Sequence, residues 1–477
     1  MPPFVARARE RQVLLDALNA DASQFVAVYG RRRVGKTFLV RETFGYTFTF
    51  QHAGLARGKL DEQLFAFRAS LKDAGFESAE RARTWLEAFE QLKDLIRASS
   101  DQRKVIFLDE LSWMDTPRCD LMVALESFWN GWASARKDVI LIVCASATSW
   151  ILNKVVHNKG GLYNRLTAQI DLKPFSLCEC EELARSMGVA LNRHQLLECY
   201  MIMGGVPFYW THLKRGLSLP QNIDALFFSS DGPLKHEFDY LFSSLFRNPA
   251  DYLSLVEALS KRKIGMTREE LAHAAGLSQS GALTTKLADL ESCGFIRKYL
   301  PFGKKSKGAL YQLVDCFTLF AFRFLRGRVT DEHYWSNTTN TPGQNSWCGL
   351  AFELVCLNHV THIKTALGVA GVASDVNSWS CKANPDVGVY GSQIDLLISR
   401  RDQVVNLCEM KYARSEFAIT RAVEEDVLRK VNDLQICTGT RSAIHVTFIA
   451  PYGIRQNAHA GVAQAVVTAD DLFRRIL

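Results

Sequence analysis

The sequence predicts an α/β fold divided into several domains, and three observations support this prediction. The chain has 477 residues, which is room for roughly three domains of about 150 residues each. Residues 25–29, 105–108 and 139–144 are short apolar runs, typical of buried strands in a parallel sheet. Residues 251–313 instead have the pattern of three helices followed by a hairpin.

The composition is that of a globular protein with enough apolar material for a core. Hydrophobic residues make up 48% of the chain, charged residues 22%, and the mean hydropathy is −0.04. These values exclude a disordered chain and a collagen-like repeat. The longest apolar runs fall far short of the roughly 18 residues that a spanning helix needs, and the charged start lacks an export signal. We therefore expect a soluble cytoplasmic protein with no membrane partner.

The cysteine pattern also favours a reducing compartment. None of the twelve cysteines lies in a C-x-x-C pair, and many occupy apolar positions, as Cys144 and Cys356 do. The one close pair, Cys178 and Cys180, has no His or Cys partners at zinc spacing. Reduced core thiols are the preferred interpretation.

A glycine-bounded loop follows the first predicted strand and opens a helix, the context expected of a phosphate-binding loop. Its glycines let successive N–H groups turn toward phosphates at the positive end of a helix dipole. Lys36 is expected to reach the β- and γ-phosphates, and the Thr37 hydroxyl to ligate Mg²⁺. The predicted nucleotide-binding residues of this loop are Gly30, Arg31, Arg32, Arg33, Val34, Gly35, Lys36, Thr37 and Phe38.

The strand at residues 104–109 ends in two carboxylates, at the edge of the sheet where ligands gather. We expect Asp109 to hold Mg²⁺ together with Thr37, and Glu110 to activate the attacking water. On its own, an acidic strand end can also cap the next helix. The phosphate-binding loop about 70 residues upstream favours the catalytic role.

Two further features are candidates for the same site. Ser146 and Thr148 follow the strand at 139–144, where they could sense the γ-phosphate or hydrogen-bond the turn. Arg165 could act as an arginine finger in cis or in trans, or serve as a surface or structural arginine.

Residues 1–215 resemble a family of prokaryotic AAA+-type ATPases described as archaeal-type ATPases. The resemblance implies ATP hydrolysis with Mg²⁺, an ATPase core over residues 1–175 and a helical lid over 176–245. One departure is that the lid shows no clear arginine aimed at the γ-phosphate. The segments that carry the resemblance are Arg7-x-Arg9-Glu10, Tyr29-GRRRVGKT, Phe107-LDE, Ala145-SATSW, Gly161-LYNR and Gly204-GVPFYW.

The net charge of +7 comes from one segment of the chain. Residues 241–330 hold fourteen Lys and Arg but seven Asp and Glu, so the remainder of the chain sums to zero. A local positive excess is typical of a surface that meets phosphates, although a solvated basic face without a partner is the alternative.

The same segment has the element order of a winged helix-turn-helix, which we assign to residues 246–330. Thr267 and Glu270 form a capping box, residues 278–290 are the predicted recognition helix, and a lysine-rich loop joins strands 295–300 and 309–313. We expect contact with the DNA backbone more than base readout, and a protein–protein module is the alternative. The predicted DNA-binding residues are Lys286, Arg297, Lys298, Lys304, Lys305 and Lys307.

The C-terminal part, residues 331–477, carries a second set of candidate catalytic residues. Asp395 lies on one predicted hairpin strand, and Glu409 and Lys411 share a face of the next. With a turn centred near residue 401, Asp395 faces Leu407 and Glu409 is its diagonal neighbour. The two carboxylates are then expected to hold Mg²⁺ or Mn²⁺, and Lys411 to orient or deprotonate the attacking water.

This arrangement is similar to the PD-(D/E)xK nuclease-like superfamily, with Glu353 on a helix beginning near Trp347 as an accessory ligand. Residues 346–477 also resemble the C-terminal domain of unknown function that accompanies the ATPase family named above. Asp395 is preferred over Asp386 as the strand aspartate because its register matches Glu409. An exposed charged edge, or an inactive relic that only binds, is the alternative.

The predicted fold class is therefore α/β, with a P-loop ATPase core, a helical lid, a winged helix-turn-helix and a C-terminal α/β nuclease-like domain. The expected function is Mg-ATP hydrolysis coupled to DNA binding and to metal-dependent DNA cleavage. The alternatives are a nucleotide-dependent switch or scaffold, and a transcriptional regulator. The oligomeric state, including a homo-oligomer, stays open.

Overall fold

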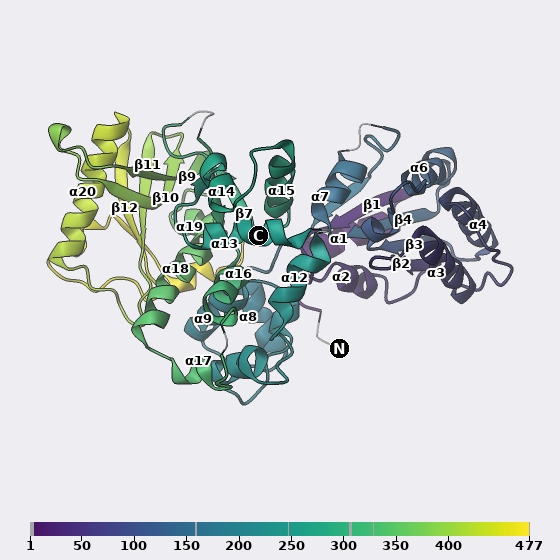
Figure 1. Ribbon diagram of the computed structural model, residues 1–477, viewed down its shortest axis with the longest axis horizontal. Coiled ribbons are helices and arrows are strands. Elements are labelled where there is room, and N and C mark those ends of the chain that lie inside the picture. The colour runs from purple at the N-terminus through teal and green to yellow at the C-terminus, as the bar shows by residue number, and fades with distance from the viewer. Residues whose placement is uncertain (1–3, 158–159, 247, 305–307, 328, 477) are drawn as a thin grey trace. The chain divides into compact units, whose positions relative to one another are not determined.

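The chain divides into two compact units (Figure 1). The N-terminal unit is Phe4–Pro174 and the C-terminal unit is Phe175–Leu477. The predicted boundaries at residues 245 and 330 therefore fall inside the C-terminal unit. The computed structural model describes residues 4–157, 160–246, 248–304, 308–327 and 329–476.

The N-terminal unit is built on a parallel sheet with strand order β2-β3-β4-β1-β5. The predicted parallel α/β fold of this part is confirmed, and the predicted strands lie within about a residue of the observed ones. The strands are β1 (Gln24–Tyr29), β2 (Phe50–Ala53), β3 (Lys104–Asp109), β4 (Val139–Ala145) and β5 (Ala168–Asp171).

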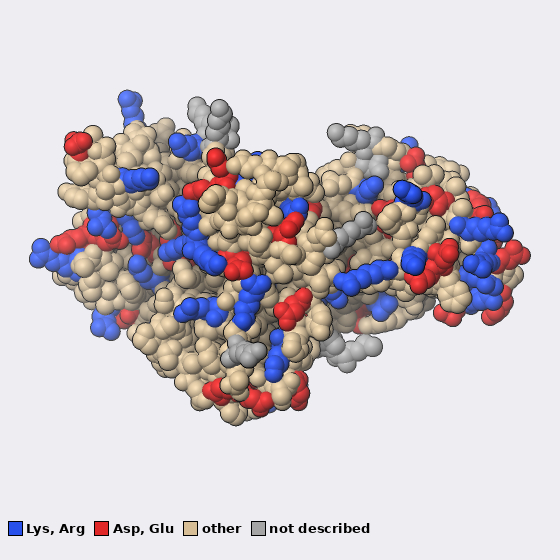
Figure 2. Space-filling view, viewed as in Figure 1, with Lys and Arg blue, Asp and Glu red and all other residues tan. Residues whose placement is uncertain are grey.

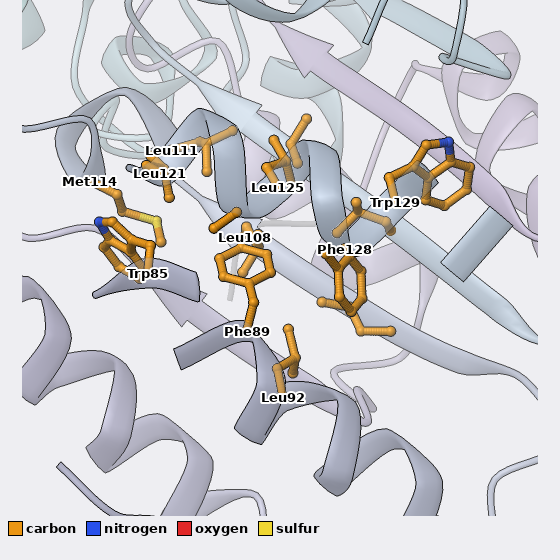
Figure 3. Packing of buried hydrophobic residues seen from close by; sticks show 14 of the residues in the cluster. Trp85, Phe89, Leu92, Leu108, Leu111, Met114, Leu121, Leu125, Phe128 and Trp129 are labelled. Atoms are coloured by element: carbon orange, nitrogen blue, oxygen red, sulfur yellow. The ribbon is translucent and has the colours of Figure 1, made fainter. Parts of the chain in front are cut away.

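Helices cover both faces of this sheet because successive strand residues point to opposite sides. Phe25 and Ala27 pack on the side of α3, α4 and α6, whereas Val26 and Val28 pack on the side of α1 and α2. Figure 3 shows part of the first core, in which Trp85, Phe89 and Phe128 lie close to one another. The helices are α1 (Ala8–Asn19), α2 (Lys36–Thr43), α3 (Leu60–Asp73), α4 (Trp85–Ala98), α5 (Leu111–Met114), α6 (Leu121–Gly131), α7 (Thr148–Ile151), η1 (Ala133–Ala135) and η2 (Leu152–Val156).

The C-terminal unit begins with a group of helices. Helix α9 ends at Met203, with Gly204 as its C-cap, and α10 begins at Pro207, since proline fits the first turn of a helix. These helices are α8 (Leu177–Ser186), α9 (Arg193–Met203), α10 (Pro207–Trp210), α11 (Leu219–Ile223), η3 (Asp224–Phe228) and α12 (Glu237–Leu245).

Three helices and a small antiparallel sheet of order β6-β8-β7 follow. The capping box is present, since the Thr267 hydroxyl accepts the N–H of Glu270 and the Glu270 carboxylate accepts the N–H of Thr267. The third helix begins at Gly281, three residues after the predicted start at Ser278. The elements are α13 (Pro249–Ser260), β6 (Met266–Thr267), α14 (Arg268–Ala274), α15 (Gly281–Ser292), β7 (Ile296–Tyr299) and β8 (Leu310–Leu313).

The chain ends in a mixed sheet of order β13-β12-β11-β10-β9. Strands β9, β10 and β11 are antiparallel, and β11, β12 and β13 are parallel. The strands are β9 (Ser374–Cys381), β10 (Ser392–Arg400), β11 (Val404–Met410), β12 (Ala443–Ile449) and β13 (Ala465–Val467). The helices around them are α16 (Cys316–Phe320), η4 (Ala321–Leu325), α17 (Tyr334–Asn337), α18 (Pro342–Asn358), α19 (Val360–Ala366), η5 (Pro385–Val387), α20 (Arg421–Thr438), η6 (Ala460–Val462) and α21 (Ala469–Leu472).

Two sequence predictions about this region are corrected. The long helix α18 begins at Pro342 rather than near Trp347, because Thr341 caps it by accepting the N–H of Gln344 and proline fits its first turn. The hairpin pairs Leu397 with Leu407, so Asp395 does not face Leu407. The turn is centred at residue 402 and not at 401, and it includes Gln403 at φ +63°. The partner of each β10 residue on β11 therefore lies two residues further along the chain than predicted.

Within the described residues, no helix is both long and apolar enough to cross a membrane.

Candidate functional site

The predicted phosphate-binding loop lies between β1 and α2 and needs glycine at both ends. Gly30 has φ +142°, and a Cβ atom there would lie 2.3 Å from the carbonyl oxygen of Leu172. Gly35 has φ +94° at the N-cap of α2, a conformation that L side chains rarely adopt. The loop backbone therefore curls tightly over the end of β1 and leads into a helix N-terminus, which favours anions.

The charged and hydroxyl side chains of this loop are held close to the sheet. Lys36 is buried, and its Nζ donates to the carbonyl oxygens of Gly30 at 2.9 Å and of Arg31 at 3.0 Å. The Thr37 hydroxyl donates to Oδ2 of Asp109 at 2.7 Å. Burial raises the pKa of Asp109, and this hydrogen bond only partly offsets that effect. The Thr37 hydroxyl and the Asp109 carboxylate thus meet at one point beside the loop, and their role as Mg²⁺ ligands stays a prediction.

The other predicted loop residues surround this point with different degrees of exposure. Arg31 and Val34 are buried, whereas Arg32, Arg33 and Phe38 are partly exposed. Arg33 has φ +69°, so the loop turns at this residue as well. Their side-chain roles stay predictions.

Glu110 is held by Ser146, a contact that the sequence did not predict. The Ser146 N–H donates to Oε2 of Glu110 at 3.1 Å, and the Ser146 hydroxyl donates to Oε1. Glu110 itself has φ +47°, which turns the chain sharply at the end of β3. The Ser146 hydroxyl thus binds the predicted catalytic carboxylate, and its role as a sensor of the γ-phosphate stays a prediction.

Thr148 and Arg165 differ from Ser146 in their surroundings. Thr148 is buried at the start of α7, and its Oγ1 has no hydrogen-bond partner among the described residues. Arg165 is exposed in the turn after Leu162. Its role as an arginine finger stays a prediction.

The C-terminal unit brings together the predicted carboxylates and a lysine that the sequence did not single out. Lys263 Nζ lies 2.7 Å from Oε1 of Glu353 on α18 and 2.8 Å from Oδ2 of Asp395 on β10. Asp395 lies at a bulge, where the pairing of β10 with β9 shifts between Ile394 and Leu397. Two carboxylates from different elements therefore converge on a single cation.

Glu409 lies next to this pair on β11. The hairpin register pairs Leu396 with Cys408, so its continuation sets Glu409 across from Asp395 rather than diagonal to it. The Glu409 carboxylate is bound by Lys411 at 2.8 Å and by Lys430 of α20 at 2.9 Å. We name Glu353, Asp395, Glu409, Lys411, Lys430 and Lys263 the acidic cluster.

Burial and neighbouring charges shift the pKa values of Glu353 and Lys263 in the acidic cluster. Burial and the charge of Asp395 raise the pKa of Glu353 to about 7, although Lys263 opposes this shift. Burial alone would lower the pKa of Lys263, but the attraction of Asp395 and Glu353 outweighs it, so the lysine stays charged.

The described residues contain no group of three or more His, Cys, Asp or Glu side chains arranged to hold a metal ion. In the acidic cluster, the Lys263 ammonium lies between Glu353 and Asp395, whereas Lys411 and Lys430 bind Glu409. Sequence reasoning missed Lys263 because it is 90 residues from Glu353 and 132 from Asp395. The spacing of Lys430 from Asp426 on α20 was a visible signal of an ion pair, but not of a contact with Glu409.

The predicted DNA-binding cations are not equally accessible. Lys298 and Lys304 are exposed, whereas Lys286 pairs with Asp251 at 3.4 Å. Lys305 and Lys307 lie outside the described residues.

Arg297 is half-buried, with its guanidinium over the Tyr299 ring and its Nε donating to Gln312, and its contact with DNA stays a prediction. Figure 2 shows basic and acidic side chains intermixed on the face drawn, over α20 and over α3 and α4. Part of the positive excess of residues 241–330 is neutralised by carboxylates outside that segment, since Lys263 pairs with Glu353 and Asp395.

Comparison with known proteins agrees with the geometry of the N-terminal unit. Residues 4–213 match a family model described as an ATPase domain predominantly from Archaea. An uncharacterized protein of Methanocaldococcus jannaschii, MJECL04, is 24% identical over 432 residues, which cover 90% of this chain and 91% of that protein.

Solved structures were also found at low similarity. The Walker-type ATPase PABY2304 of Pyrococcus abyssi has a TM-score of 0.46 and 16% identity, covering 67% of this chain and 96% of that one. The ORC2 protein of Aeropyrum pernix, solved as ADPNP-ADP complexes, has a TM-score of 0.43 and 15% identity, covering 75% and 96%.

The glycine-bounded loop, the buried lysine and the threonine–aspartate contact all lie within the segment that the family model covers. The match to an ATPase domain predominantly from Archaea thus covers residues 4–213, less than half of the chain, and includes the whole N-terminal unit.

Proposed function

We propose that this chain binds and hydrolyses Mg-ATP in its N-terminal unit and uses the nucleotide cycle to control DNA processing by its C-terminal unit. The single observation that carries the ATPase part is the contact between Thr37 and Asp109 beside the buried Lys36. It joins the phosphate-binding loop to the acidic end of β3, as hydrolysis requires.

Different residues of the site would bind the phosphates, hold Mg²⁺ and activate the attacking water. Backbone N–H groups of residues 30–37 and the Lys36 ammonium would hold the phosphates, once Lys36 exchanges its carbonyl partners for phosphate oxygens. Thr37 and Asp109 would hold Mg²⁺, which neutralises charge on the phosphates when bound. Glu110 would orient the attacking water and accept its proton, with Ser146 holding its carboxylate in place.

ATP turnover by point variants tests this assignment. Lys36→Ala should lose nucleotide affinity, whereas Glu110→Gln should keep ATP bound and stop turnover. Isothermal titration with ATP and a phosphate-release assay distinguish the two outcomes. Turnover of ATP by Glu110→Gln at the wild-type rate would show that another residue is the base.

The proposed DNA contact is made by residues 246–330, as a winged helix-turn-helix. The order of α13, α14, α15 and the β7–β8 hairpin supports it, as do the exposed Lys298 and Lys304. The ammonium groups of these lysines can pair with DNA phosphates. Such contacts depend on charge and not on the base sequence.

Metal-dependent DNA cleavage is the proposed activity of the acidic cluster. Its support is that Glu353 and Asp395 converge on one cation, and that Glu409 and Lys411 follow on the adjacent strand. Carboxylate oxygens of Asp395 and Glu409, with Glu353 as accessory, would hold Mg²⁺ or Mn²⁺, which activates water when bound. Lys411 would orient that water and offset charge on the phosphate.

Plasmid nicking in Mn²⁺ tests this activity. Asp395→Asn should abolish nicking and leave ATP turnover unchanged. Asp375→Asn is a matched control, because Asp375 is an exposed aspartate on the neighbouring strand β9. Nicking that survives Asp395→Asn would come from another site.

A second candidate is a nucleotide-dependent switch whose C-terminal domain binds DNA or a protein partner without cutting. The observation that favours it is the saturation of the acidic cluster by lysines, since Glu409 alone has two ammonium partners. DNA binding without nicking across Mg²⁺, Mn²⁺ and Co²⁺ would support this candidate.

A further inference from the structure

Lys263 reaches the acidic cluster from a part of the chain that belongs to the proposed DNA-binding segment. It lies between α13 and β6, and it contacts α18 and β10. The side chains of Glu353 and Asp395 are only 13% and 16% exposed. The ammonium therefore fills the place where the two carboxylates point, and little solvent reaches them.

Arg297 is a second cation of the same segment, and it is connected to Lys263 through Gln312. Its Nε donates to Oε1 of Gln312 at 2.8 Å, and Gln312 Nε2 donates to the carbonyl oxygen of Lys263 at 2.7 Å. Its buried Nη2 has no hydrogen-bond partner among the described residues, and its charge acts on Asp395. Lys263, Gln312 and Arg297 thus form one hydrogen-bonded group, which reaches the carboxylates through the Lys263 ammonium.

This group is anchored to the nuclease-like sheet by the β7 hairpin. Asn377 Nδ2 donates to the carbonyl oxygen of Leu300 at 2.8 Å, and the Phe302 N–H donates to the carbonyl oxygen of Ser378 at 2.9 Å. The Tyr299 hydroxyl accepts from Ser378 at 2.5 Å and donates to the carbonyl oxygen of Ile264, next to Lys263. We name residues 263–302 the covering segment.

We propose that the covering segment holds the acidic cluster in a locked state, with Lys263 as a tethered cation that excludes a divalent metal ion. The proposal rests on the proposed function of the acidic cluster and concerns its regulation. A metal ion and the ammonium need the same oxygens of Glu353 and Asp395, and they repel each other at that distance. Metal binding therefore requires the covering segment to withdraw. The bound metal ion and the docked covering segment each lower the binding affinity of the other by the same factor.

The test is Mn²⁺ binding to the full-length chain without nucleotide, measured by the electron paramagnetic resonance signal of free Mn²⁺. Lys263→Met should bind Mn²⁺ at least about tenfold more tightly than wild type, because the competing cation is gone. Lys263→Gln keeps a hydrogen-bond donor without the charge, and it should give the same gain if the Met variant folds poorly. Lys261→Met is the matched control, since Lys261 is exposed and pairs with Glu257, and it should behave as wild type.

The outcomes separate the lock from the cleavage activity. The gain in Mn²⁺ affinity must disappear in Lys263→Met combined with Asp395→Asn. If both Lys263 variants stay within twofold of wild type, the lock is overturned, even where Asp395-dependent nicking is present. If the gain is found but no DNA is nicked, the lock stands and the proposed cleavage fails.

Hydrogen exchange of the wild type supplies a second measurement. Saturating Mn²⁺ should speed amide exchange in residues 263–267, because metal binding expels Lys263. Slower or unchanged exchange in a chain that has bound Mn²⁺ at Asp395 would overturn the proposal.

Discussion

The Ser146 hydroxyl and N–H both donate to the carboxylate of Glu110. These two hydrogen bonds connect the residue after β4 to the residue after β3. The two strands are parallel neighbours in the sheet, and their carboxyl ends meet at one edge. A serine that the sequence pattern placed near the γ-phosphate thus contacts the predicted base directly.

Ser146→Ala should lower kcat for ATP hydrolysis about tenfold while KM for ATP stays within about twofold, because the variant loses only the positioning of Glu110. Steady-state phosphate release measures both constants. Ser146→Thr, which keeps a hydroxyl, should recover most of the rate. A rise in kcat in Ser146→Ala would show that Ser146 restrains the base instead of positioning it.

Gly30→Ala should destabilise the N-terminal unit by about 2–4 kcal/mol, because the new Cβ would overlap the carbonyl oxygen of Leu172 at a backbone angle that alanine disfavours. Urea unfolding measures the loss. Gly131→Ala is the control, since nothing lies within 4 Å of a Cβ at this last residue of α6. That substitution should be neutral or stabilising by up to about 1 kcal/mol.

Lys298→Ala and Lys304→Ala should each weaken DNA binding and reduce the slope of log K against log salt by about 1, because each removes one backbone contact. Fluorescence anisotropy at several salt concentrations measures the slope. Lys286→Ala should change the slope less, since Lys286 already pairs with Asp251. Equal losses for unrelated DNA sequences are expected, and a loss confined to one sequence would contradict backbone recognition.

His359 should make the C-terminal unit less stable in mild acid. Burial lowers its pKa to about 3, and its ring bonds the Val355 carbonyl oxygen through Nδ1 while Nε2 accepts the Leu177 N–H. The unfolded chain takes up a proton near pH 6.5 and the folded chain does not. Stability is therefore full above pH 6.5 and falls by about 1.4 kcal/mol per pH unit toward pH 3.

Urea unfolding at pH 7, 6 and 5, followed by tryptophan fluorescence, checks this pH dependence. His359→Gln cannot be charged, so its stability should fall less steeply between pH 6.5 and 5 than that of wild type. Equal slopes for the two proteins would assign the acid sensitivity to other groups.

Local signals were enough to predict much of this fold from the sequence. The strand before Gly30, the helix after Lys36 and the capping box at Thr267 depend on neighbours within a few residues, and each is present. The hairpin of β10 and β11 was also predicted, but its register was wrong by two residues. A turn of three residues with Gln403 at positive φ leaves no strong sequence signal, and register depends on it.

The sequence by itself determined the phosphate-binding loop, because glycines, lysine and threonine at fixed spacing set the local backbone and the chemistry together. It also predicted which carboxylates act, at Asp109, Glu110, Asp395 and Glu409, and these roles stay predictions. Only the tertiary structure decided what each of these groups touches: Ser146 on Glu110, Lys430 on Glu409 and Lys263 between Glu353 and Asp395. Such contacts join residues far apart in the chain, and charge and burial at those distances exist only once the core has packed.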